Sequence, residues 1–143
     1  MTADFFLSYV NVCKKPGVRS LCYQNMNTMK YLLQAEAIVP FILSVVLLNM
    51  IPLHFAWWAW ILLFLAPDIS MIGYILNNKV GAFIYNLFHH QLIAVIVCGI
   101  GLLLQQPYVE LAGLVLLGHS SLDRFMGFGL KTVEGFKHTH LSK

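Results

Sequence analysis

Histidines and carboxylates recur within stretches of this sequence that are otherwise apolar. His119 and Asp123 lie four residues apart, and so do Tyr85 and His89, with Asn86 between them. Residues three or four apart share one face of a helix, so each set can point in one direction. A histidine and a carboxylate one helical turn apart can ligate one metal ion, as paired helical histidines do in zinc sites. The residue types and their spacing therefore indicate metal binding.

A carboxylate that follows a helix-breaking proline is a candidate for proton transfer. Pro67 removes a helical hydrogen bond and clashes with the carbonyl of Leu63, directly before Asp68. Within a membrane such a break is tolerated mainly where the backbone faces protein or a wet cavity. We expect Asp68, or else Glu36 in the first apolar stretch, to act as a general base beside a metal ion.

The composition places these residues in a membrane protein. The 143 residues are 59% hydrophobic and 10% charged, whereas soluble domains have roughly 45–50% and 25%. The length suits one domain. A net charge of +3 without a basic run argues against nucleic acid. Membrane lipids are the expected partners, and nucleic acid is not.

Four apolar segments predict an all-α fold. They cover about residues 31–50, 55–76, 80–104 and 109–130, and each is close to the ~20 residues that a helix needs to cross the membrane. The breaks between them are short and turn-like, which makes neighbouring helices antiparallel. We expect residues 30–143 to form an integral membrane, up-down-up-down four-helix bundle with a short cytoplasmic C-terminal tail.

The positive charges predict the topology of this bundle. All Lys and Arg residues fall on one side of a four-pass chain, so the positive-inside rule puts both termini in the cytoplasm. These residues are Lys14, Lys15, Arg19, Lys30, Lys79, Arg124, Lys131, Lys137 and Lys143.

With this topology, the polar residues lie at similar depths in the cytoplasmic half of the bilayer. Counting about 1.5 Å per residue from the cytoplasmic helix ends gives depths of about 9–12 Å for Glu36, Asn86, Asp68 and Asp123, and about 15–18 Å for His89 and His119. An ionisable group at the centre of a membrane helix costs roughly 2.5–3.5 kcal/mol. A chain that carries several at one depth is expected to use them together.

Arg124 is a further charged residue at this level. Adjacent residues point apart on a helix, so it does not pair with Asp123. Its expected partner is Asp68, Glu36 or a lipid phosphate, and the alternative is that it snorkels to the cytoplasmic interface. The C-terminal tail lies on the same side and can fold back to add His140 as a ligand.

Residues 1–29 are mixed in polarity and have no clean period. We expect a disordered extension, or one that precedes the true start at Met26 or Met29; an amphipathic segment on the membrane surface is the alternative. The three cysteines include no Cys-x-x-Cys pair, and we expect reduced thiols at Cys13, Cys22 and Cys98.

Several of these motifs, in order, resemble a family of proteins. Residues 66–74, 85–89 and 119–124, with the ending Thr139-His140-Leu141, are similar to a bacterial family of small four-helix membrane proteins, the domain of unknown function DUF4260. The resemblance covers about residues 30–141. It implies the fold and a multi-pass location in the bacterial inner membrane, and it implies no activity. It favours His89 over His90, and His140 over His138, as functional residues.

Two functions fit this pattern. The first is a metal-dependent membrane hydrolase with one divalent ion, such as zinc, manganese or iron, and Asp68 or Glu36 as general base. The second is a non-enzymatic membrane protein, either a structural bundle or a proton or ion path, whose polar residues form a buried hydrogen-bond and ion-pair network. A path through so few helices would require a homodimer. For the hydrolase, the predicted ligands are His89, His119, Asp123 and His140, with Tyr85, Asn86 and Arg124 as further polar residues of the site.

Overall fold

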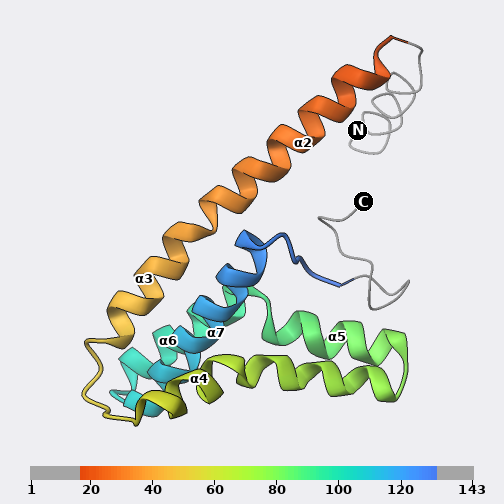
Figure 1. Cartoon of the computed structure of the whole chain (residues 1–143). Helices are drawn as coiled ribbons and strands as arrows, with labels where there is room; N and C mark the ends of the chain where they lie inside the picture. The colour runs from red at the N-terminus through yellow and green to blue at the C-terminus, as the bar shows by residue number, and fades with distance from the viewer. Residues whose placement is uncertain (1–16, 132–143) are drawn as a thin grey trace. The chain divides into compact units, whose positions relative to one another are not determined.

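The computed structural model describes residues 17–131, and the elements in this range are helices (Figure 1). The chain divides into two units, residues 1–33 and 34–143, and the functional residues discussed below belong to the second. The extension predicted for residues 1–29 is helical from Arg19 onward. The helices are α2 (Arg19–Glu36), α3 (Ile38–Leu48), α4 (Trp57–Leu65), the 3-10 helix η1 (Ala66–Ile75), α5 (Asn78–Phe88), α6 (Gln91–Leu103) and α7 (Pro107–Phe125).

The helices have the length and apolar character that a membrane requires. The stretches Asn27–Leu48 and Trp57–Ile75 are each long and apolar enough to cross it. Asn78–Phe88 and Gln91–Leu103, bent by 47° at their junction, qualify as a third span if they are taken together. The all-α class predicted from the sequence is therefore confirmed for the described residues, and two or up to three stretches are apolar enough to span a membrane, whereas the predicted four-helix up-down bundle is not confirmed. The predicted fourth span, now α7, is not among them, and it carries three charged residues, Glu110, Asp123 and Arg124.

Two of the predicted segments change conformation part-way along. Segment 55–76 begins as α4 and becomes the 3-10 helix η1 at Ala66, next to Pro67. Proline lacks the N–H that continues an α-helix, which explains the change at this position. Segment 80–104 is interrupted at His89 and His90, between α5 and α6. These two breaks are where Asp68 and His89 are found.

The packing of the second unit centres on α7. This helix lies against both α6 and α3, while α5 returns alongside η1 (Figure 1). The contact between α6 and α7 is close enough that a Cβ atom at Gly113 would overlap the backbone of Cys98. The apolar core near one end of α7 contains Leu48, Ile51, Leu111, Leu114 and Val115.

An apolar cavity of about 660 Å³ lies between α3 and α4, with Phe41, Trp60 and Phe64 in its wall. None of the histidines and aspartates predicted to form the site lines it. His54 of the connecting loop does line it, but this exposed residue was not predicted to belong to the site. The cavity is therefore separate from the polar site described below.

The cysteines differ in state. Cys22 in α2 is disulfide-bonded, so the prediction of a reduced thiol is wrong for this residue. Cys98 in α6 is a free thiol, as predicted. Cys13 lies outside the described residues.

Candidate metal centre

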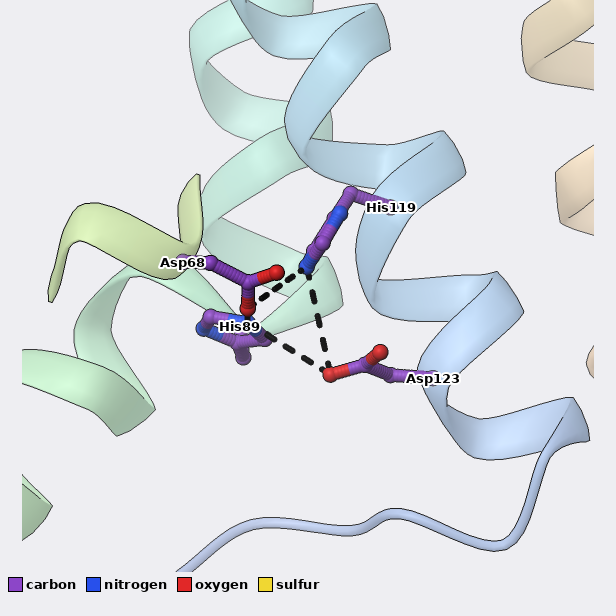
Figure 2. A group of neighbouring side chains, drawn as sticks. All are labelled: Asp68, His89, His119 and Asp123. Atoms are coloured by element: carbon purple, nitrogen blue, oxygen red, sulfur yellow. Dashed lines mark ion pairs between the residues drawn. The ribbon is translucent and has the colours of Figure 1, made fainter. Parts of the chain in front are cut away.

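Four of the predicted polar residues meet at one point of the second unit (Figure 2). Asp68 comes from η1, His89 from the end of α5, and His119 and Asp123 from α7. One ligand atom from each residue lies within 4.8 Å of the other three. Residues that are far apart in the sequence thus form a single cluster, which we call the His/Asp cluster.

In the cluster, the Nε2 atom of each imidazole faces one oxygen atom of each carboxylate. The Nε2 atom of His119 is 3.3 Å from Oδ1 of Asp68 and 4.0 Å from Oδ2 of Asp123. The Nε2 atom of His89 is 3.7 Å and 3.5 Å from the same two oxygens. Around a tetrahedral ion with bonds of about 2.0–2.2 Å, ligand atoms lie roughly 3.3–3.6 Å apart. The four nitrogen–oxygen distances, 3.3–4.0 Å, are close to this range, and all separations between ligand atoms in the cluster are within 4.8 Å.

The histidines of the cluster are buried and under-satisfied. His89 is 3% exposed and His119 is 4% exposed. Within the described part of the chain, neither Nε2 atom has a hydrogen-bond partner, and neither does Nδ1 of His119. Leaving a buried polar atom unpaired costs about 1–3 kcal/mol, and native proteins rarely do so. A cation between the four groups would satisfy both Nε2 atoms at once.

The tautomer of His89 is set by its own helix. Its Nδ1 atom lies 3.0 Å from the carbonyl oxygen of Tyr85. A carbonyl only accepts hydrogen bonds, so Nδ1 carries the proton and donates it. In the neutral ring Nε2 then has a free lone pair, and this is the atom that faces the cluster. An Nδ1–H bonded to a backbone carbonyl is a common arrangement for a metal-binding histidine.

Tyr85 supports two members of the cluster. It is 1% exposed, and its ring stacks on that of His89 with centroids 3.8 Å apart and planes at 13°. Its hydroxyl donates a hydrogen bond of 2.9 Å to Oδ2 of Asp123. One tyrosine therefore fixes the plane of one imidazole and the position of one carboxylate.

A comparison with known protein families matches most of the chain to one of them. The model of the domain of unknown function DUF4260 matches residues 30–143. The chain belongs to the DUF4260 family. The match contains all four residues of the His/Asp cluster, and it confirms the resemblance seen in the sequence. No curated protein and no solved structure matches the chain.

In this DUF4260 chain, Asn86 has a structural role beside the cluster. Its side-chain amide donates to the carbonyl of Lys131 at 2.9 Å and accepts from the amide of Lys131 at 2.8 Å. The pair of bonds ties the segment after α7 to α5. Sequence reasoning placed Asn86 among the polar residues of the site but did not predict a backbone partner for it.

The same tie brings Lys131 close to the cluster. Its ammonium lies 5.3 Å from the centre of the Tyr85 ring. Burial lowers the pKa of Lys131, and the negative charges of Asp123 and Asp68 act in the opposite direction. Sequence reasoning used this lysine only as a topology signal, because it follows the last apolar segment.

Arg124 in the DUF4260 chain has a different partner from those expected. Its Nη1 atom donates to Oε1 of Gln91 at 2.9 Å, and Gln91 donates in turn to the hydroxyl of Ser121 at 2.9 Å. Among the described residues, neither Asp68 nor Glu36 forms an ion pair with Arg124. Gln91 was not predicted, since a glutamine at the start of an apolar stretch carries no distinctive signal.

Two predicted site residues lie elsewhere. Glu36 is exposed and is not a member of the cluster, which leaves Asp68 as the candidate base that lies with the histidines. His140 lies outside the described residues.

Proposed function

We propose that this DUF4260 protein is a metal-dependent hydrolase of the bacterial inner membrane. In this proposal His89, His119 and Asp123 hold one divalent ion, such as zinc, manganese or iron, and Asp68 is the general base. The observation that carries the proposal is the pair of buried Nε2 atoms that lack hydrogen-bond partners and face two carboxylates. Two histidines and one carboxylate form a ligand set found at catalytic zinc and non-haem iron sites.

The division of roles between the two carboxylates follows from their surroundings. The side chain of Asp123 is 15% exposed and is held by the Tyr85 hydroxyl, which suits a fixed ligand. The side chain of Asp68 is 39% exposed, which makes it the more accessible of the two carboxylates and the better candidate for the base. A bound divalent ion polarises a substrate and lowers the pKa of water to near neutrality. Asp68 then accepts the proton that the attacking water loses.

The proposal includes a four-pass topology with both termini in the cytoplasm. The one-sided distribution of Lys and Arg supports it. The fourth crossing would be α7, which packs against α3 and α6 and buries much of its surface. A helix that faces protein needs less hydropathy than one that faces lipid, because its polar groups are covered by neighbouring helices.

The alternative is a non-enzymatic membrane protein in which the cluster is a structural network. Such a network would satisfy its imidazoles with hydrogen bonds or with ion pairs, and the Nε2 atoms of His89 and His119 do lie within ion-pair distance of Asp68 and Asp123. In the described chain, Nδ1 of His89 has a hydrogen bond, whereas the other three imidazole nitrogens of the cluster have none. An ion pair through Nε2 of His89 would need a second proton on a buried ring whose Nδ1 already carries one, which supports a bound ion over the structural network.

The hydrolase is tested with chromogenic substrates. Protein purified in detergent is assayed with p-nitrophenyl acetate and p-nitrophenyl phosphate before chelation, after chelation, and after zinc, manganese or iron is restored. Asp68→Asn should lower the rate by roughly 10²–10⁴-fold while the metal content is kept. Glu110→Gln is the matched control, since Glu110 lies on α7 outside the cluster. A rate that neither chelation nor Asp68→Asn changes would overturn the proposal.

A further inference from the structure

Arg124 is a charged residue whose charge no carboxylate among the described residues balances. It lies one position after the cluster residue Asp123 and is partly buried. Its hydrogen-bond partner among the described residues is neutral, the amide oxygen of Gln91. Removing a guanidinium from water without a counter-ion is costly, so an anion is the missing partner. A planar guanidinium with several remaining donors suits the oxygens of a phosphate.

A hydrogen bond to Gln91 holds the side chain of Arg124 against the neighbouring helix α6. Gln91 accepts from Nη1 of Arg124 and donates to Ser121, whose exposure is 0%. An arginine that snorkels to the lipid headgroups would extend away from the helices and would not need this buried anchor. The anchor fixes the guanidinium on the side of α7 that faces α6.

Arg124 and the cluster border the same small hollow. His89, Asp123 and Arg124 line it together with Gly129 and Leu130 of the segment after α7. Its volume of about 10 Å³ is near the smallest that can hold one water molecule. A phosphoryl group is larger than this hollow, so its binding requires the segment at Gly129 to shift. Two hydrogen bonds between Asn86 and Lys131 hold that segment in the unbound protein.

From this juxtaposition we propose that Arg124 is the phosphate-binding residue of the site and that the substrates are phosphate monoesters. The inference rests on the proposed hydrolase and names its substrate class. Lys131 adds a second positive charge on the same side, near Tyr85. Asp123 also lines the hollow, but its charge is taken up by the metal ion of the proposal and by the Tyr85 hydroxyl.

The reaction balances without a further reactant. The oxygen of water bonds to phosphorus, and the bond between phosphorus and the ester oxygen breaks. Asp68 takes a proton from the attacking water and then gives that proton up, through solvent water, to the departing ester oxygen, which becomes an alcohol. The products are inorganic phosphate and that alcohol. Arg124 remains bound to the phosphoryl oxygens throughout and stabilises their charge.

The proposal is tested by binding measurements on the full chain in detergent, with metal content determined on each sample. Inorganic phosphate is titrated by calorimetry, and vesicles of phosphatidylcholine with and without phosphatidic acid are tested by co-flotation. The two probes distinguish a free phosphate from a lipid phosphate. Arg124→Gln should weaken binding of phosphate or of phosphatidic acid about 10- to 100-fold, and Arg124→Lys should weaken it less. Lys79→Gln removes an exposed positive charge and should bind as the wild type does.

The outcomes separate this inference from the hydrolase itself. Weakened binding by Arg124→Gln with unchanged metal content supports the inference. If the wild type holds no metal but its binding still depends on Arg124, the hydrolase fails and the phosphate site stands. Equal binding by wild type and Arg124→Gln, or binding by neither, overturns the inference. So does a loss of metal in Arg124→Gln, because Arg124 would then support the cluster and not the phosphate.

Discussion

At the scale of single residues, His89 determines what the cluster can do. Its Nδ1 atom is bonded to the Tyr85 carbonyl, its ring is stacked on the Tyr85 ring, and the His119 ring lies across it at 74°. These contacts leave Nε2 directed at Asp68 and Asp123 with a free lone pair. The geometry is that of a ligand prepared before an ion arrives, which reduces the ordering that binding requires.

Tyr85 provides the first residue-scale prediction. Tyr85→Phe keeps the stacked ring and removes the hydroxyl that donates to Asp123. We expect the affinity for metal to fall about 10- to 100-fold, the usual effect of losing an outer-shell hydrogen bond. Chelator competition measures this. Tyr108→Phe, at a site 66% exposed, is the control. Equal affinities in wild type and Tyr85→Phe would contradict the role given to Tyr85.

The sequence predicted that the four residues of the His/Asp cluster lie at a similar depth, but it did not predict that they contact one another. Helical rise places Asp68, His89, His119 and Asp123 in one layer of the bilayer whichever way each helix turns. Their meeting depends on the rotation and tilt of each helix, which packing decides. Glu36 shows that depth alone does not predict contact. It has a suitable predicted depth, but its side chain is exposed and does not belong to the cluster.

At the scale of elements, the breaks in the helices position the site. Asp68 follows the change from α4 to η1, and His89 ends α5. The first break could be predicted, because Pro67 cannot continue an α-helix. The second has no such signal, since neither proline nor glycine lies at His89 and His90. A continuous helix over residues 80–104 was therefore the natural interpretation of the sequence, and the structure replaces it with α5 and α6.

The close contact of α6 and α7 gives an element-scale prediction with a built-in control. A Cβ at Gly113 would overlap the backbone of Cys98, whereas a Cβ at Gly99 meets nothing within 4 Å. Gly113→Ala should destabilise the protein by about 1–3 kcal/mol through overpacking. Gly99→Ala should be neutral or stabilising by up to about 1 kcal/mol, the difference in helix propensity. Thermal unfolding in detergent measures both. Equal stability of the two variants would show that α6 and α7 do not approach this closely.

At the scale of the whole molecule, the sequence predicted the class of protein better than its path through the membrane. Apolar segments near 20 residues long fix the helical class, because only helices satisfy a lipid-exposed backbone within one segment. Hydropathy says less about α7, whose charged residues Asp123 and Arg124 are partly buried and bonded to other side chains. The proposed fourth crossing, by α7, therefore rests on the distribution of Lys and Arg and not on hydropathy.

A topology measurement tests this crossing. Reporter fusions at Lys143 and in the turn at residues 52–54 should report opposite compartments, with the C-terminal fusion in the cytoplasm. The physical reason is the one-sided placement of every Lys and Arg. Fusions that report the same compartment would remove α7 as a span and, with it, the depth assigned to the cluster.

The central claim is that the His/Asp cluster holds a metal ion, and elemental analysis tests it most directly. Detergent-purified wild-type protein should carry about one zinc, manganese or iron per chain. His89→Ala and His119→Ala should lose most of it, because each removes a buried nitrogen of the cluster. His54→Ala, at an exposed position outside the cluster, should retain it. Substoichiometric metal that is the same in all four proteins would contradict the account.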